Sequence, residues 1–187
     1  MNRENKGLQI LFLIFMTPLL FSQDIRDVNW TSFEKEDVQF IYLNKTSDFT
    51  VDKYLFKVIW DDKLSYSENI GFYGGVKSLK IVKGTKVLND IKNIEDVIAL
   101  NRVVFRFYDF NFDGYIDFAL PISGGKRTWL KYYFYDSSIK KFKHNKNWDY
   151  LSIQKINKNE KLILTQPGGM EGNRIVYKIE NQQLIKQ

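Results

Sequence analysis

The sequence contains no cysteine and only one histidine, and these two shortages exclude several kinds of chemistry. Because none of its 187 residues is Cys, disulfides, thiolate metal sites and a lipid-modified N-terminal cysteine are ruled out. A zinc peptidase would lack ligands, and no serine lies in a G-x-S-x-G motif. The single His144 stands among lysines, which is typical of a surface residue. We therefore predict a non-enzymatic protein.

Carboxylate chemistry is the one catalytic route that the composition leaves open. The chain has 22 Asp and Glu residues, and two of them facing each other across a cleft could hydrolyse a glycan. No spacing in the sequence selects such a pair. A glycan-directed hydrolase is therefore the less favoured alternative.

Long apolar runs are also scarce. The main one, at residues 8–21, follows a short, net-positive start and is interrupted by Thr17 and Pro18. It is shorter than the roughly 20 residues that span a bilayer. The pattern predicts a signal peptide over residues 1–22 and a single secreted β-rich domain over residues 23–187. We expect a secreted or periplasmic location, with no transmembrane span after processing; an uncleaved N-terminal anchor is the alternative.

Positive charge and aromatic side chains are abundant. The formal net charge is +6 and 16% of the residues are aromatic, within a hydrophobic share of 44% that can build a packed core. A soluble, Lys-rich surface is the favoured interpretation of the charge. Contact with anionic envelope polymers or acidic protein surfaces is the alternative. The expected location disfavours nucleic acid as a partner.

Short segments rich in β-branched and aromatic residues recur along the chain, separated by turn-forming residues such as those at 61–63 and 74–75. Strand signals about every 8 to 12 residues predict a mainly β, antiparallel meander, arranged as a sandwich, a barrel or a small propeller-like ring. The expected strands lie at residues 38–43, 54–60, 76–82, 103–108, 118–122, 128–135, around 142, 148–156, 162–165, 175–179 and 184–185.

One segment has helical periodicity instead. Apolar residues recur at spacings of three and four at Val87, Ile91, Ile94, Val97 and Ile98. This is the pattern of an amphipathic helix. We therefore predict one short helix around residues 87–100.

The most specific chemical signal is DFNFDGYID at residues 109–117. Side-chain oxygen donors occupy alternate positions, and Gly114 stands at the sixth position, as in a calcium loop. Hard oxygen donors suit Ca²⁺ better than zinc, and Mg²⁺, which would have to keep several waters, is the alternative. We predict a Ca²⁺ site with four side-chain ligands and one backbone carbonyl, from Asp109, Asn111, Asp113, Asp117 and Tyr115 respectively.

The loop differs from an EF-hand. Leu120 takes the twelfth position, where an EF-hand has a bidentate Glu, and the flanks have the composition of strands. Crowded carboxylates resist joint ionisation, which favours a bound cation. The affinity expected without the Glu is modest, about 10⁻⁴ to 10⁻³ M, and the role structural. The alternative is a hairpin turn around Asp113 and Gly114 with solvated carboxylates.

The run FYDFNFDGYIDFALP, the following TWLKYYFYD and the KKF turn resemble a group of secreted or periplasmic bacterial proteins. The type member of that group is an immunity protein against a peptidoglycan hydrolase, a β-rich, calcium-binding inhibitor of a lysozyme-like toxin. The resemblance is close over residues 108–136 and loose over residues 54–187. It implies calcium binding by Asp109, Asn111, Asp113 and Asp117, and an inhibitor or immunity function.

Residues 123–127, SGGKR, look like the Ser-Gly loop that periplasmic lysozyme inhibitors insert into the enzyme. Ser123, Gly124, Lys126 and Arg127 are therefore candidate partner-binding residues, since a hydroxyl and a cation can reach the paired carboxylates of a glycosidase. A flexible Gly-rich hairpin is the favoured alternative. The positive net charge fits an acidic hydrolase better than a basic lysozyme.

Together these features predict a non-enzymatic, calcium-stabilised envelope or secreted binding protein, a candidate inhibitor or immunity protein of a peptidoglycan hydrolase. The alternative is a carbohydrate-binding or adhesive envelope module that uses exposed aromatic residues, such as Trp129, Trp148 or Tyr150.

Overall fold

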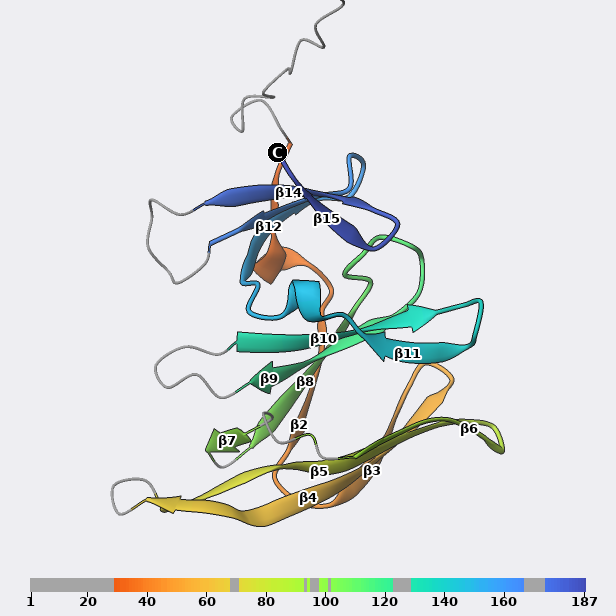
Figure 1. Ribbon diagram of the computed structural model, residues 1–187, viewed down its shortest axis with the longest axis vertical. Helices are drawn as coiled ribbons and strands as arrows, with labels where there is room; N and C mark the ends of the chain where they lie inside the picture. The colour runs from red at the N-terminus through yellow and green to blue at the C-terminus, as the bar shows by residue number, and fades with distance from the viewer. Residues whose placement is uncertain are drawn as a thin grey trace, which may run out of the picture.

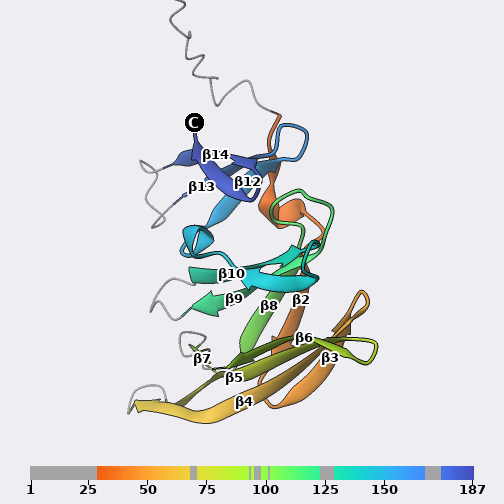
Figure 2. The same ribbon diagram turned by 45° about the vertical axis from the view of Figure 1, so that its right-hand side comes forward.

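The computed structural model of the chain describes residues 29–67, 71–92, 94, 98–100, 102–122, 129–166 and 174–187. These residues form three antiparallel sheets stacked as layers (Figures 1 and 2). The predicted mainly β, antiparallel fold is confirmed, and the layered arrangement is nearest to the expected sandwich. The predicted signal peptide, residues 1–22, lies outside the described residues.

The sheets are named here by their place in the stack. The first sheet contains β3 (Ser47–Val51), β4 (Tyr54–Ser67), β5 (Gly71–Lys83) and β6 (Lys86–Lys92), with β7 (Ile98–Leu100) paired to β5. The central sheet has the order β11 (Lys141–His144), β10 (Trp129–Asp136), β9 (Asp117–Ile122), β8 (Val103–Tyr108) and β2 (Gln39–Leu43). The C-terminal sheet has the order β1 (Thr31–Ser32), β12 (Ile153–Asn157), β13 (Leu162–Thr165), β14 (Ile175–Glu180) and β15 (Gln183–Lys186).

Helical structure in the described residues is limited to two 3-10 turns, η1 (Phe33–Lys35) and η2 (Lys146–Trp148). None of the described helices is long and apolar enough to cross a membrane. Most neighbouring strands follow one another in the chain, as a meander requires. The exceptions are β2, which pairs with β8, β1, which pairs with β12, and β7, which pairs with β5.

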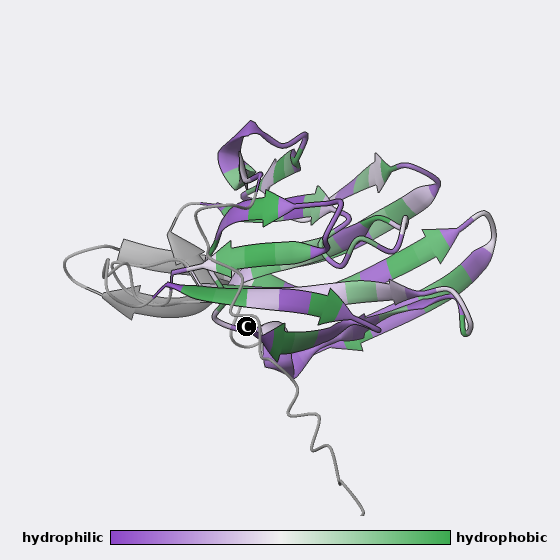
Figure 3. Cartoon of the chain, turned by 90° about the horizontal axis from the view of Figure 1, so that it is seen from above, coloured by the Kyte–Doolittle hydropathy of each residue, from purple (hydrophilic) through white to green (hydrophobic). Residues whose placement is uncertain are grey.

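The central sheet is buried on both faces. In β9, Phe118 belongs to the core shared with the first sheet, whereas Ala119 belongs to the core shared with the C-terminal sheet. In β10, Tyr133 and Tyr132 divide between the two cores in the same way. A strand buried on both faces has a nearly continuous apolar sequence, which explains the aromatic runs of this region. Elsewhere hydrophobic and hydrophilic residues alternate along many strands (Figure 3).

One side chain joins the first sheet to the central sheet. Asn89 on β6 donates a hydrogen bond to the Phe142 carbonyl on β11 at 2.8 Å and accepts one from the Phe142 N–H at 3.0 Å. The Asn89 side-chain amide thus makes the two hydrogen bonds to Phe142 that the backbone of a further strand beside β11 would make. The two sheets are tied at this edge by hydrogen bonds as well as by the core.

The predicted helix around residues 87–100 is wrong. Residues 86–92 form β6 and residues 98–100 form β7, while residues 93 and 95–97 lie outside the described part. Leu88 is buried and Val87 is half-exposed, because neighbouring residues of a strand face opposite sides. Pairing with β5 across the turn at Gly84, whose φ is +58°, overrides the helical spacing.

Two predicted turns lie inside long strands. Residues 61–63 belong to β4 and residues 74–75 to β5. The register between β4 and β5 shifts between Asp61 and Ser65. The turn-forming residues therefore mark a β-bulge and not a reversal of the chain.

Candidate metal site

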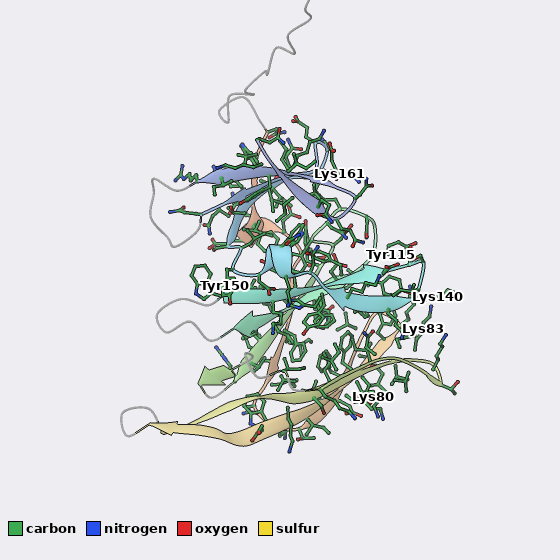
Figure 4. The ribbon with its side chains drawn as sticks, in the orientation of Figure 1. Lys80, Lys83, Tyr115, Lys140, Tyr150 and Lys161 are labelled. Atoms are coloured by element: carbon green, nitrogen blue, oxygen red, sulfur yellow. The ribbon has the colours of Figure 1, made fainter. Side chains whose placement is uncertain are left out.

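The loop between β8 and β9 carries the predicted calcium ligands. β8 ends at Tyr108 and β9 begins at Asp117, and these two residues are partners in the ladder. Residues 109–116 therefore form a loop whose two ends are fixed by the central sheet. Figure 4 shows Tyr115 on the right-hand side of the molecule and Tyr150 on the left-hand side, both at about mid-height.

Side-chain oxygens of the loop accept hydrogen bonds from its own backbone. Asp109 accepts the N–H of Asp113 at 3.0 Å and that of Gly114 at 2.8 Å. Asn111 Oδ1 accepts the same Asp113 N–H at 3.1 Å, and its Nδ2 donates to Asp113 Oδ2 at 2.9 Å. Asp113 Oδ1 in turn accepts the N–H of Tyr115 at 3.0 Å. These bonds hold the oxygens of Asp109, Asn111 and Asp113 close together.

Two residues of the loop have left-handed backbone conformations. Gly114 has a φ of +87°, which glycine adopts without strain. Phe112 has a φ of +56°, which is uncommon for a residue with a side chain. Its ring packs against the core shared with the C-terminal sheet, and this burial offsets the backbone strain. The left-handed φ of Gly114 thus explains why the sixth position of the pattern is a glycine.

Asp117 fastens the loop to the central sheet. Its side chain is fully buried, with 0% exposure. Oδ2 accepts the N–H of Phe110 at 3.1 Å, and Oδ1 accepts the N–H of Tyr135 on β10 at 2.9 Å. The carboxylate therefore joins three segments of the chain. Its role as a calcium ligand stays a prediction.

The loop concentrates negative charge without a positive partner in the described residues. Burial raises the pKa of Asp117 well above its usual value, and the charges of Asp113 and Asp109 raise it further, against the hydrogen bonds from Tyr135 and Phe110. Burial also raises the pKa of Asp109, opposed by hydrogen bonds from Gly114 and Asp113. No Lys or Arg of the described residues forms an ion pair with any of the three aspartates.

The donor set of the loop fits a hard cation. Each carboxylate oxygen that accepts one N–H keeps a second lone pair, and the Tyr115 carbonyl adds a neutral oxygen. No three His, Asp or Glu side chains of the described residues are already gathered at metal-binding spacing. Asp109, Asn111, Asp113 and the Tyr115 carbonyl would supply about half of the six to eight oxygens that Ca²⁺ takes. Water or Asp117 would complete the shell.

The predicted partner-binding residues Ser123, Gly124, Lys126 and Arg127 lie outside the described residues. The structure therefore neither brings them to the metal loop nor separates them from it, and their role stays a prediction.

The aromatic residues considered for carbohydrate binding are not equally available. Trp148 is fully buried at 0% exposure, and its Nε1 donates to the Gln182 carbonyl at 3.2 Å. Its predicted exposure is wrong, because the C-terminal sheet covers it. Trp129 and Tyr150 form an edge-to-face pair with centroids 5.7 Å apart, and Tyr150 is 56% exposed. The two lie together, while Trp148 belongs to the core.

His144 is better anchored than its Lys-rich surroundings indicate. Its Nε2 lies 2.9 Å from both carboxylate oxygens of Asp149. Its ring also lies against Tyr133, with centroids 5.3 Å apart. In the sequence, the signal for this pair is that Asp149 follows His144 by five positions. The pair fixes η2 beside β11.

A cleft lies between the central and C-terminal sheets. It has a volume of about 500 Å³ and is lined by residues that include Phe40, Arg106, Lys155 and Arg174. These residues come from four separate segments, so no local pattern indicates the cleft.

No protein-family model, curated protein or solved structure matches the chain in searches against each. The fold and the loop therefore define the class directly: a three-layered antiparallel β protein with an aspartate-rich loop between two central strands.

Proposed function

We propose that this chain is a calcium-stabilised, non-enzymatic binding protein, secreted or periplasmic, that inhibits a peptidoglycan hydrolase. The observation that carries the calcium-binding part of the proposal is the 109–117 loop, while the inhibitor part rests on the resemblance of residues 108–136 to the immunity-protein group. Three aspartates crowd there, two of them with raised pKa, and no described cation compensates them. A bound divalent cation would remove this electrostatic cost.

The loop assigns distinct tasks to its residues under this proposal. Asp109, Asn111 and Asp113, together with the Tyr115 carbonyl, hold the ion. Asp117 fixes the loop to β10 through the Tyr135 amide, and water or Asp117 itself would complete the shell. The ion would stabilise the scaffold, and recognition of the partner would take place on a neighbouring surface.

The expected effect on stability is modest and measurable. At a calcium concentration about tenfold above the dissociation constant, binding adds about 1.4 kcal/mol to the free energy of unfolding. For a domain of this size, that corresponds to about 3 to 6 °C in Tm.

Thermal unfolding with calcium or with EDTA tests the metal site. Asp113→Asn keeps an oxygen that can accept the Tyr115 N–H but removes one negative charge, so the variant should lose most of the calcium-induced shift. Asp48→Asn is the matched control, since Asp48 is an exposed aspartate of the first sheet whose ion-pair partner is Lys57. Equal Tm values of the wild-type protein in calcium and in EDTA would refute the site.

Enzyme assays test the inhibitor proposal separately. The purified protein is added to a panel of acidic and basic lysozyme-type hydrolases, and peptidoglycan turnover is measured. We expect slower turnover by at least one acidic member. Unchanged rates across the panel would remove the inhibitor proposal and leave the calcium site untouched.

A further inference from the structure

The cleft between the central and C-terminal sheets has an unusual lining. β8 and the neighbouring β2 contribute Arg106 and Phe40, and the C-terminal sheet side contributes Lys155 and Arg174. Glu34 and Glu36 line the cleft near η1. Its volume of about 500 Å³ is enough for a few side chains of a bound peptide.

Arg106 stands at the border between the cleft and the core. It pairs in register with Phe40 on one side and Ala119 on the other. Its Nε is buried and has no hydrogen-bond partner in the described residues. The guanidinium lies over the Phe40 ring, 5.9 Å from its centroid. A buried donor of a charged group without an acceptor costs free energy, and a carboxylate bound to the other N–H groups of the guanidinium would stabilise its charge.

The charges of the cleft favour an anionic ligand. Glu36 is already occupied, because it accepts a hydrogen bond from the Tyr108 hydroxyl at 2.8 Å and forms an ion pair with Lys158. Among the described residues, no carboxylate forms an ion pair with Arg106, Lys155 or Arg174. Three cations therefore face one uncommitted carboxylate, that of Glu34.

The strand beside the cleft favours a peptide over a glycan. β2 is an edge strand of the central sheet, so in the described part no strand pairs with its outer side. Edge strands present main-chain groups that a further peptide strand can bind. Phe40 and Tyr42 are 45% and 55% exposed on this strand and stack with centroids 6.5 Å apart. Arg102 lies over the Tyr42 ring, 4.8 Å from its centroid.

We propose that this cleft binds an extended acidic peptide segment of the partner protein. A Glu or Asp carboxylate of that segment binds Arg106, with Lys155 and Arg174 beside it, and the peptide lies along β2 over Phe40 and Tyr42. The guanidinium offers two parallel N–H donors to a carboxylate, a geometry that a lysine cannot supply. This inference rests on the proposal that the protein acts by binding, but it does not depend on calcium.

Fluorescence anisotropy with a labelled peptide that alternates Glu and Thr tests the proposal. The same peptide with Gln in place of Glu is the charge control, and polygalacturonate is the polysaccharide competitor. We expect the Glu peptide to bind at least about tenfold more tightly than the Gln peptide, since charge-assisted hydrogen bonds would be lost. We expect polygalacturonate not to displace it.

Variants connect the binding to the cleft. Arg106→Lys keeps the charge but removes the fork of donors, and should weaken binding about tenfold or more. Lys155→Ala, an exposed position, should weaken it by a smaller factor and provides the test if Arg106→Lys does not fold. Lys83→Ala, at the end of β5, is the matched control and should bind like the wild type.

Equal affinities for the Glu and Gln peptides would overturn the proposal, as would wild-type binding by both Arg106→Lys and Lys155→Ala. Displacement by polygalacturonate would overturn the choice of a peptide. A calcium-induced rise in Tm without peptide binding would refute the cleft and leave the metal site standing. Peptide binding without any calcium effect would refute the metal site alone.

Discussion

Replacing Asp117 with alanine tests whether this residue holds the loop in place independently of any ion. The carboxylate accepts two backbone amides, Phe110 N–H at 3.1 Å and Tyr135 N–H at 2.9 Å, in a fully buried position. Asp117→Ala leaves both donors without an acceptor in a space that excludes water. The loop would then lose its connection to β10.

The magnitude follows from two opposing effects. A buried donor without a partner costs about 1 to 3 kcal/mol, so two donors cost about 2 to 6 kcal/mol. Removing Asp117 also removes a buried negative charge near Asp113 and Asp109, whose effect is to raise its pKa. That relief offsets part of the loss. We therefore expect a net destabilisation of about 2 to 4 kcal/mol, a large part of the 5 to 15 kcal/mol typical of a domain.

The assay is thermal unfolding of Asp117→Ala in EDTA, where calcium cannot contribute. The expected drop in Tm is at least about 4 °C. Asp117→Asn should lose less, since its amide oxygen can still accept one of the two N–H groups. A Tm in EDTA within about 1 °C of the wild-type value would refute the reasoning. A drop in Tm seen only in calcium would show that Asp117 acts as a calcium ligand and that its hydrogen bonds to the backbone do not stabilise the fold.

Two further predictions concern pH and the contact between sheets. Folding raises the pKa of Asp109 and Asp117, so their contribution to stability in EDTA is full below about pH 3.8 and is lost as pH rises through the raised folded values. Because calcium needs the ionised carboxylates, the difference in Tm between calcium and EDTA should be larger at about pH 7 than at about pH 5. An equal difference at the two pH values would contradict this prediction. Asn89→Ala removes both hydrogen bonds to Phe142 and should lower the free energy of unfolding by about 1 to 3 kcal/mol. Urea unfolding measures this loss. Asn89→Asp keeps only the acceptor, so its free energy of unfolding should lie between those of the wild type and of Asn89→Ala.

The sequence was sufficient for the β fold because its signals are local. Alternation, β-branched residues and turn formers act within a few positions, so most central strands were predicted near their true bounds. The loop at residues 109–117 was predicted for the same reason, since a calcium-loop pattern is contiguous. Its hydrogen bonds give Gly114 and Asp113 a physical role in the turn.

The failures depend on contacts between distant segments. The apolar spacing of residues 87–100 suits a helix, but the long strand β5 provides a partner for residues 86–92. Trp148 looked available in a polar stretch and is covered by the C-terminal sheet. Arg106 looked like an ordinary residue of a central strand. Its position beside a cleft arises only when two sheets meet, which no window of sequence contains.

The metal loop and the cleft are connected through β8, which ends at the loop and carries Arg106 three positions earlier than Asp109. Between them, Tyr108 packs edge-to-face against Phe33 with centroids 5.4 Å apart, and its hydroxyl donates to Glu36 in the cleft wall. The core therefore fixes the cleft at this point, whether or not an ion occupies the loop. Calcium should raise the unfolding temperature of the scaffold, while peptide affinity measured well below that temperature should be the same in calcium and in EDTA. An affinity that falls in EDTA while the protein stays folded would show instead that the ion shapes the cleft through β8.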